Sequence, residues 1–296
     1  MARLVETMGV MPMTDERLAT VRAVELGSVT SPHVDQHDHV VPGDPEVGVR
    51  VYRPAGVEGR LPGLLWIHGG GYVVGNPAMD DEKLHRLCTD LGLVAVSVDY
   101  RLAPETPYPG PLEDCYRALQ WAFESAGSLG IDVARVGIGG SSAGGGLAAG
   151  LALLARERGG PPLRFQLLDC PMLDDRQVTW SSQQDDRPIW SRESNTYGWR
   201  AYLGDLYGRD DVPPTAAPAR ATDLSGLPPA YVSVGTVDGF LDEDVDYALR
   251  LNHAGVPTEL HVYPGACHGY HYAADSEITL QSRRDEREWL ARQIRR

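Results

Sequence analysis

The sequence predicts an α/β fold in which a mostly parallel sheet carries helices on both faces. Apolar, strand-like runs alternate with helix-forming segments over most of the 296 residues, as expected for strands joined by crossover helices. One apolar run ends in the glycine-rich turn 140–144, and an Ala/Leu-rich helical segment follows at once. His68, Ser142, Asp238 and His268 each come just after a predicted strand, at the edge where active residues of such sheets gather.

The bulk composition limits the classes of partner. With 42% hydrophobic and 23% charged residues, the chain is ordinary for a globular protein. Its formal charge of −14 argues against a nucleic-acid partner, because phosphate binding needs a basic face, and it disfavours attraction to anionic membranes. No apolar run approaches the roughly 18 residues of a spanning helix, and Glu6 interrupts any signal-peptide core. We expect a soluble, cytoplasmic protein without nucleic-acid binding or stable membrane association.

Residues 1–45 are predicted to form a lead-in with some helical character at its start, followed by a loop. Three histidines cluster in that loop with two aspartates, but their spacing does not match a zinc site and prolines lie on either side. We therefore favour a solvated loop and expect no metal. The cysteines lack C-x-x-C spacing and are expected to be reduced thiols. These residues are His33, His37, His39, Cys88, Cys115, Cys170 and Cys267.

The first half of the α/β pattern begins at residue 47. Residues 47–52 alternate in polarity as a half-exposed strand does, whereas 61–67 and 93–100 are continuous apolar runs suited to strands buried on both faces. Helices are predicted at 81–91 and at 112–125, where apolar residues recur on one face.

The second half of the pattern follows the turn at Ser142. Strands are predicted at 163–170, 230–235 and 258–263, with helices from about 243 to 254 and at the C-terminus. Residues 171–217 break the rhythm, because charges and aromatic residues mix there without a strand. We interpret this segment as a mostly helical insertion that covers part of the molecule.

Ser142 is the candidate nucleophile, because a Gly-x-Ser-x-Gly turn between strand and helix presents its serine on a sharp corner. A serine hydroxyl needs a base within hydrogen-bond reach and an acid that orients that base. Asp238 and His268 follow in the nucleophile–acid–histidine order of α/β-hydrolases.

Other residues compete for these roles. Asp242 is the alternative acid, although it and Glu243 suit the first turn of the next helix, where carboxylates are favourable. Alternative histidines are less well placed, since they lie in a strand, at a helix end or beside the favoured base. Cys267 adjoins His268, but a Cys–His pair adds nothing to the serine hypothesis. The alternative histidines are His261, His253 and His271.

Residues 68–71, His-Gly-Gly-Gly, are expected to supply backbone N–H donors for the oxyanion of an acyl-transfer reaction, together with Ala143. A glycine run after a strand could instead cradle phosphate. We disfavour that alternative, because the chain has no G-x-x-x-x-G-K-[ST] pattern and no clear helix start follows the glycines.

Taken together, these motifs resemble the hormone-sensitive-lipase-like branch of α/β-hydrolase esterases, also called bacterial family IV. The resemblance extends from about residue 47 to the end, and residues 171–176 and 237–243 look closest to acetyl-esterase and heroin-esterase-like members. It implies an eight-stranded, mostly parallel sheet in a catalytic domain of residues 46–296, with a helical cap formed by 1–45 and 171–217. The matching stretches are 68–71, 99–105, 140–145, 238–243 and 268–269.

The resemblance also implies roles for individual residues. Ser142 would be the nucleophile, Asp238 the orienting acid and His268 the base, with Gly70, Gly71 and Ala143 as oxyanion donors. Candidate substrate contacts are Tyr72, Trp190, Phe240 and Tyr270. Two departures from the family are Ser141, where an aspartate is common, and an Asp-Gly-Phe-Leu-Asp-Glu stretch that loses an arginine and brings in Phe240.

The predicted function is hydrolysis of small, short-chain acyl esters through a serine acyl-enzyme, with no cofactor or metal. Two rival functions are weighed: a non-hydrolytic small-molecule-binding member of the fold, and an amidase or peptidase with the same triad. A binding protein would be expected to lose the serine or the histidine, and both are present. The expected partner is a small-molecule ester, and the resemblance is compatible with a homodimer through the last strand or helix.

Overall fold

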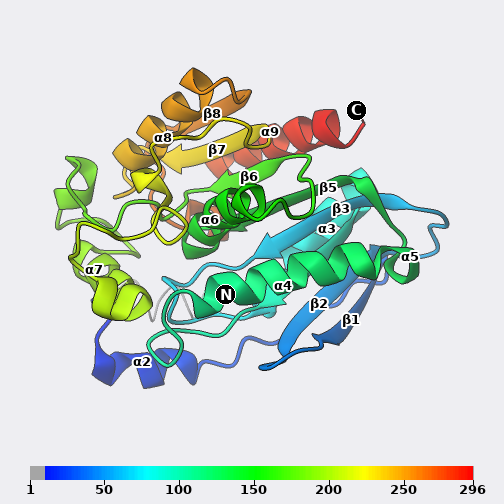
Figure 1. Cartoon of the computed structure of the whole chain (residues 1–296), viewed down its shortest axis with the longest axis horizontal. Coiled ribbons are helices and arrows are strands. Elements are labelled where there is room, and N and C mark those ends of the chain that lie inside the picture. Colours follow the sequence, from blue (N-terminus) through cyan, green and yellow to red (C-terminus); the bar gives the residue numbers. More distant parts are fainter. Residues whose placement is uncertain (1–10, 296) are drawn as a thin grey trace.

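The computed structural model describes residues 11–295 and contains one eight-stranded sheet, as the family resemblance implies (Figure 1). The strand order is β1-β2-β4-β3-β5-β6-β7-β8. β2 is antiparallel to β1 and to β4, and the remaining neighbours are parallel. The strands are β1 Val34–Val41, β2 Val47–Pro54, β3 Leu61–Ile67, β4 Val94–Asp99, β5 Ile131–Ser141, β6 Gln166–Asp169, β7 Ala230–Gly235 and β8 Thr258–Tyr263.

Helices cover both faces of the sheet because its central strands are apolar on both sides. In β3, Leu64 and Trp66 join the buried cluster that includes residues of α3 and α9, while Leu65 and Ile67 join the cluster that includes α4, α6 and α8. Figure 1 shows α4 and α6 in front of the sheet. The helices are α2 Asp15–Arg22, α3 Asp81–Leu91, α4 Gly110–Glu124, α5 Ala126–Leu129, α6 Ala143–Glu157, α7 Arg192–Leu203, α8 Leu241–His253 and α9 Glu277–Ile294.

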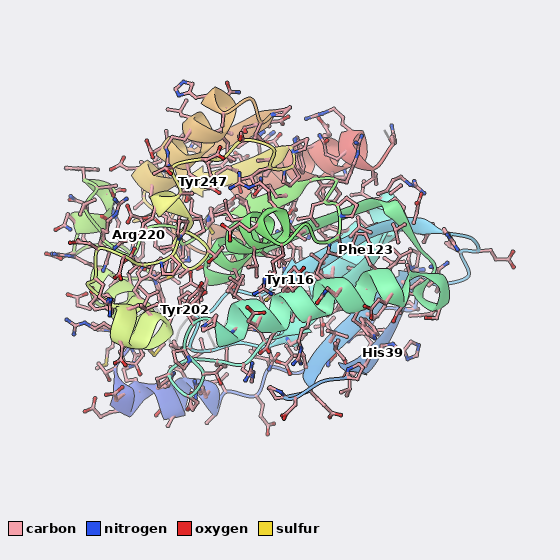
Figure 2. The ribbon with its side chains drawn as sticks, in the orientation of Figure 1. His39, Tyr116, Phe123, Tyr202, Arg220 and Tyr247 are labelled. Carbon is pink, nitrogen blue, oxygen red and sulfur yellow. The ribbon has the colours of Figure 1, made fainter. Side chains whose placement is uncertain are left out.

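The histidine-containing stretch that was predicted to be a solvated loop forms the edge strand β1. It pairs along its whole length with β2, from Val34 opposite Pro54 to Val41 opposite Val47. Its central residues are mostly exposed, and His39 is exposed at this edge of the sheet (Figure 2). The loop prediction was wrong because polar residues dominate an exposed edge strand, and part of segment 1–45 therefore belongs to the sheet and not to a cap.

The segment 171–217 departs from its expected mostly helical character. α7 is its one α-helix, and the short 3₁₀ turns η2 Ser181–Gln183 and η3 Gly204–Leu206 accompany irregular chain. Prolines at 188, 213 and 214 interrupt the remainder. α7 contacts α2, because the Tyr197 hydroxyl donates to Asp15 at 2.8 Å and the Met13 N–H donates to Ser194 at 3.0 Å. The two helices also lie near one another in Figure 1.

Within residues 11–295, no helix combines the length and the apolar character that crossing a bilayer requires.

Candidate active site

Ser142 lies at the corner between β5 and α6, in a backbone conformation that few side chains adopt. Its φ is 57° and its ψ is −121°, so the residue is strained. A Cβ at Gly140 would lie 2.2 Å from the carbonyl oxygen of Gly144, and one at Gly144 would lie 2.0 Å from that of Ile67. The turn therefore forms only because both outer positions of the motif are glycine.

Three parallel strands bring Ser142, His268 and Asp238 together at their carboxyl ends. The Ser142 Oγ lies 2.9 Å from His268 Nε2, and His268 Nδ1 lies 2.8 Å from Asp238 Oδ2. All three side chains are buried. Because a carboxylate only accepts, the hydrogen resides on Nδ1 and leaves Nε2 free to accept the serine proton. This geometry suits a nucleophile, its base and an orienting acid.

The carboxylates of the two competing acids accept hydrogen bonds outside the Ser142 site. Asp242 accepts the N–H of Ser181 at 2.8 Å, and Glu243 accepts the N–H of Leu173 at 2.8 Å, so both tie α8 to the segment 171–217. Burial raises the pKa of the Glu243 carboxyl well above its usual value. Of the competing histidines, His261 pairs with Glu259 at 2.9 Å in β8.

The glycine loop after β3 is held by a neutral histidine. His68 Nδ1 donates to the Gly69 carbonyl at 2.7 Å, and its ring stacks on Tyr100 with centroids 4.3 Å apart. Burial lowers the pKa of His68 to about 4, so its imidazole is uncharged near neutral pH. Gly70 and Gly71 have φ values of 117° and 59°, which a side chain would strain.

Three backbone N–H groups near Ser142 are available to a ligand. Within residues 11–295, none of the hydrogen bonds uses the N–H of Gly70, Gly71 or Ala143. Ala143 begins α6, where N–H groups have no intrahelical acceptor, and the two glycines line the cavity beside Ser142. The arrangement can stabilise an oxyanion.

The cavity at Ser142 is small, with a volume of about 30 Å³. Trp190 limits it, because a Cβ at Gly71 would lie 2.1 Å from the indole ring. The indole N–H donates to Asn195 at 3.1 Å, which fixes the ring. The lining residues are Gly69, Gly70, Gly71, Met79, Ser141, Ser142, Ile189, Trp190, His268, Gly269, His271 and Tyr272.

Of the four aromatic residues expected to contact substrate, only Trp190 lines this cavity. Tyr72 is fully buried and its hydroxyl donates to a carbonyl of the 171–217 segment at 3.2 Å. Phe240 packs edge-on against His268, with ring centroids 5.0 Å apart, and the Tyr270 hydroxyl pairs with a serine of α9. These three side chains lie behind the walls of the cavity. The prediction failed for them because nearness in sequence does not fix the direction of a side chain.

Four lining residues were not expected from the sequence. Met79 lies in the 3₁₀ turn η1 Pro77–Asp80, and Ile189 precedes Trp190. His271 and Tyr272 belong to the 3₁₀ turn η5, Tyr270–Tyr272, which begins two residues after His268. For His271 and Tyr272, the one signal in the sequence is their position three and four residues after His268.

Ser141 is the last residue of β5, at the position where the resembling family commonly has an aspartate. Its partner in the sheet register is Asp169 of β6. The serine Oγ itself lies 4.0 Å from Cys170 Sγ. The departure at 141 therefore places a neutral hydroxyl near the buried thiol of Cys170.

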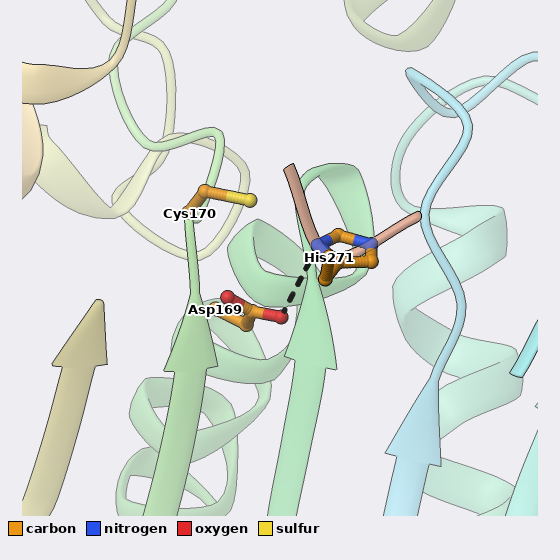
Figure 3. Close-up of side chains that lie close together, drawn as sticks. All are labelled: Asp169, Cys170 and His271. Carbon is orange, nitrogen blue, oxygen red and sulfur yellow. Dashed lines mark ion pairs between the residues drawn. The ribbon is translucent and has the colours of Figure 1, made fainter. Parts of the chain in front are cut away.

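Two groups of potential metal ligands come within 4.8 Å in the described part of the chain, and neither contains the histidines of β1. Figure 3 shows Asp169, Cys170 and His271. Lys83 lies 3.2 Å from Asp169 Oδ2 and already compensates its charge, which disfavours a cation there. The second group adds Cys170 to Asp238 and His268, which hydrogen-bond to each other. We assign no metal to either group.

Comparison with known proteins gives a family for the fold. A family described as having the alpha/beta hydrolase fold matches residues 64–272. Carboxylesterase NlhH of Mycobacterium tuberculosis is 40% identical over 228 residues, which cover 76% of this chain and 71% of that protein. The structure of a bacterial heroin esterase superposes with a TM-score of 0.92 at 40% identity, covering 100% of this chain and 98% of that one. Esterase LipW of Mycobacterium marinum gives a TM-score of 0.83 at 37% identity, covering 98% and 88%.

Proposed function

The chain belongs to the hormone-sensitive-lipase-like family of α/β-hydrolases and is a carboxylesterase, and we propose that it cleaves small, short-chain acyl esters through an acyl-enzyme on Ser142. The observation that carries the mechanism is the hydrogen-bond chain from Ser142 through His268 to Asp238, at 2.9 and 2.8 Å.

In the proposed reaction the Ser142 Oγ attacks the ester carbonyl while His268 Nε2 takes its proton. The carbonyl oxygen becomes an oxyanion, which the N–H groups of Gly70, Gly71 and Ala143 stabilise. Collapse breaks the bond to the alcohol oxygen, and the same imidazole returns the proton to that leaving oxygen. Water then attacks the acyl-enzyme with His268 again as base, which releases the carboxylic acid and restores Ser142.

Asp238 keeps the imidazole in the required tautomer and stabilises the imidazolium that forms during attack. Its second oxygen, Oδ1, accepts the Phe240 N–H at 3.0 Å, so the carboxylate is held from both sides. Such preorganisation means that little rearrangement is needed when charge develops.

The preference for short acyl chains is supported by the small cavity at Ser142, of about 30 Å³, because the Trp190 indole lies against the Gly71 backbone and limits the space there. Trp190 and Ile189 of the 171–217 segment line it. We therefore propose that this segment acts as a cap over the site together with residues 11–33, which contact it through Met13 and Asp15. Residues 1–10 of the expected cap lie outside the described part of the chain.

The experiment compares hydrolysis of p-nitrophenyl acetate, butyrate and octanoate by the wild type, Ser142→Ala and His268→Ala. The proposal expects acetate and butyrate to be favoured, and both variants to lose about 10³-fold or more in kcat. Unchanged turnover in Ser142→Ala would refute the mechanism, and a preference for octanoate would refute the short-chain specificity. An acetanilide substrate run in parallel separates ester from amide cleavage.

The other partner expectations remain predictions. Cell fractionation would check the cytoplasmic location and the lack of stable membrane association, and light scattering would check the homodimer. Fluorescence titration with a DNA duplex would check the lack of nucleic-acid binding.

A further inference from the structure

A second, larger cavity adjoins the one at Ser142. Its volume is about 200 Å³, and it lies between α3, α9 and the chain at 24–29. Met79, His271 and Tyr272 line both cavities and so form the partition between them. Since the cavity at Ser142 has room for a small acyl group only, the rest of an ester must extend beyond its walls.

The reaction geometry decides which part of the ester faces the larger cavity. The leaving alcohol oxygen must lie within hydrogen-bond reach of His268 Nε2, because this imidazole protonates it. His268 lines the cavity at Ser142 together with His271 and Tyr272, which form the partition to the larger cavity. The alcohol portion therefore lies on the side of the larger cavity.

The walls of the larger cavity combine apolar side chains with ion pairs, and the charges of these pairs compensate one another. Lys83 lies 3.2 Å from Asp169 and 2.7 Å from Glu286, which also lies 3.5 Å from Arg86. These pairs line the cavity deep in the fold, with Asp169 and Glu286 both buried. A neutral ligand that both donates and accepts hydrogen bonds suits such walls without leaving a buried charge unpaired.

His271 offers the free hydrogen-bonding group of this wall. Its Nδ1 is buried and has no hydrogen-bond partner within residues 11–295, and the nearest carboxylate oxygen, of Asp169, is 3.8 Å away (Figure 3). Burial lowers the pKa of the imidazole to about 4, so it is neutral at pH 7. A buried polar atom without a partner is costly, and a hydroxyl group would satisfy it.

Acidic residues outnumber basic ones around the remaining wall. Beyond the compensated pairs, three carboxyl groups line the cavity and one guanidinium does. This balance disfavours an alcohol that carries a carboxylate or phosphate. The residues are Glu25, Asp80, Glu82 and Arg283.

We propose that this cavity binds the alcohol portion of the substrate, that this alcohol is neutral and bears further hydroxyl groups, and that His271 is a specificity-determining residue for it. The inference rests on the proposed esterase function. It extends that function from the acyl group, which the small cavity selects, to the alcohol, which the larger cavity selects.

Three acetates test the proposal: methyl acetate, propyl acetate and glycerol monoacetate. Propyl and glycerol have the same three-carbon skeleton, so their kcat/KM ratio isolates the hydroxyl groups, and a ratio is independent of the fraction of active enzyme. The wild type should favour glycerol monoacetate. His271→Phe keeps an aromatic ring but loses the hydrogen bond, and should lower the glycerol-to-propyl ratio about fivefold. His253→Leu, at the exposed end of α8, is the matched control and should keep the wild-type ratio.

A second variant tests the position of the alcohol independently. Ala78→Leu adds bulk at a residue that lines only the larger cavity, and should lower the glycerol-to-methyl ratio about tenfold. The proposal is overturned if the wild type favours propyl acetate, or if the His271→Phe and Ala78→Leu ratios both stay within twofold of the wild type. If the wild type hydrolyses none of the three acetates, the esterase function itself fails, which is a separate result.

Discussion

Replacing Asp238 by asparagine tests whether this carboxylate, and not Asp242, orients the base. Asp238 accepts two hydrogen bonds, from His268 Nδ1 at 2.8 Å and from the Phe240 N–H at 3.0 Å. Asparagine has one oxygen and one NH₂ group, so one of these donors must face another donor. Where the NH₂ group faces Nδ1, the imidazole changes tautomer and Nε2 can no longer accept the serine proton.

The structure sets the expected size of both effects. A wrong tautomer lowers kcat about 10⁴-fold in the serine protease that serves as the reference case. One buried donor without an acceptor costs about 1–3 kcal/mol of folding free energy. We therefore expect Asp238→Asn to fold with a lower melting temperature and to lose between 10³-fold and 10⁴-fold in kcat, with KM little changed.

The matched control is Asp242→Asn. Asp242 accepts one backbone N–H, that of Ser181, and an asparagine oxygen can replace it. Its kcat should stay within about threefold of the wild type. The assay is p-nitrophenyl acetate hydrolysis at several pH values, with melting temperatures measured on the same preparations. The reasoning would be refuted if Asp238→Asn retained wild-type kcat, or if Asp242→Asn lost as much as Asp238→Asn.

Three further predictions concern the elbow, the partition and the acyl cavity. Gly144→Ala forces a Cβ within 2.0 Å of a backbone oxygen and should lower the free energy of unfolding by about 3 kcal/mol, or the melting temperature by roughly 6–12 °C. The control Gly127→Ala, whose Cβ would have no atom within 4 Å, should not lower the melting temperature. The pKa of His271 is about 4 in the folded protein against an ordinary 6.5, so the unfolded chain binds the proton first as the pH falls. The wild type should therefore lose about 2 kcal/mol of unfolding free energy between pH 7.5 and 5 that His271→Phe does not lose. Equal losses for the two proteins in urea titrations would contradict this. Trp190→Ala should raise the octanoate-to-acetate ratio of kcat/KM about tenfold. The control Trp180→Ala, which removes a 68% exposed side chain, should leave this ratio unchanged. An unchanged ratio in Trp190→Ala would mean that another wall limits the acyl group.

The sequence was sufficient for every strand of the sheet except β1 and for the residues that gather at Ser142, for a physical reason. Apolar runs buried on both faces have few alternatives to a parallel sheet, and the carboxyl ends of parallel strands meet at one edge. Ser142, Asp238 and His268 could therefore be brought together from their positions after strands alone. β1 was missed because an exposed edge strand carries the polar residues of a loop.

The cavity walls could not be predicted in the same way. Tyr72 and Tyr270 lie next to the glycine loop and the candidate base in sequence, yet both point into the packing behind the site. Met79 and Tyr272 form the partition through the path of two short 3₁₀ turns, which leave no periodic pattern in the sequence. Side-chain direction in such turns depends on tertiary contacts, and only the structure supplies them.

The most direct test of the central claim is the mass of the enzyme during turnover. Wild type mixed with excess p-nitrophenyl butyrate and quenched in acid within milliseconds should show a butyryl adduct, and peptide mapping should place it on Ser142. His268→Ala should form the adduct much more slowly, and Ser142→Ala should not form it. Ester hydrolysis at the wild-type rate with the adduct on another residue, or undiminished hydrolysis by Ser142→Ala, would contradict the account.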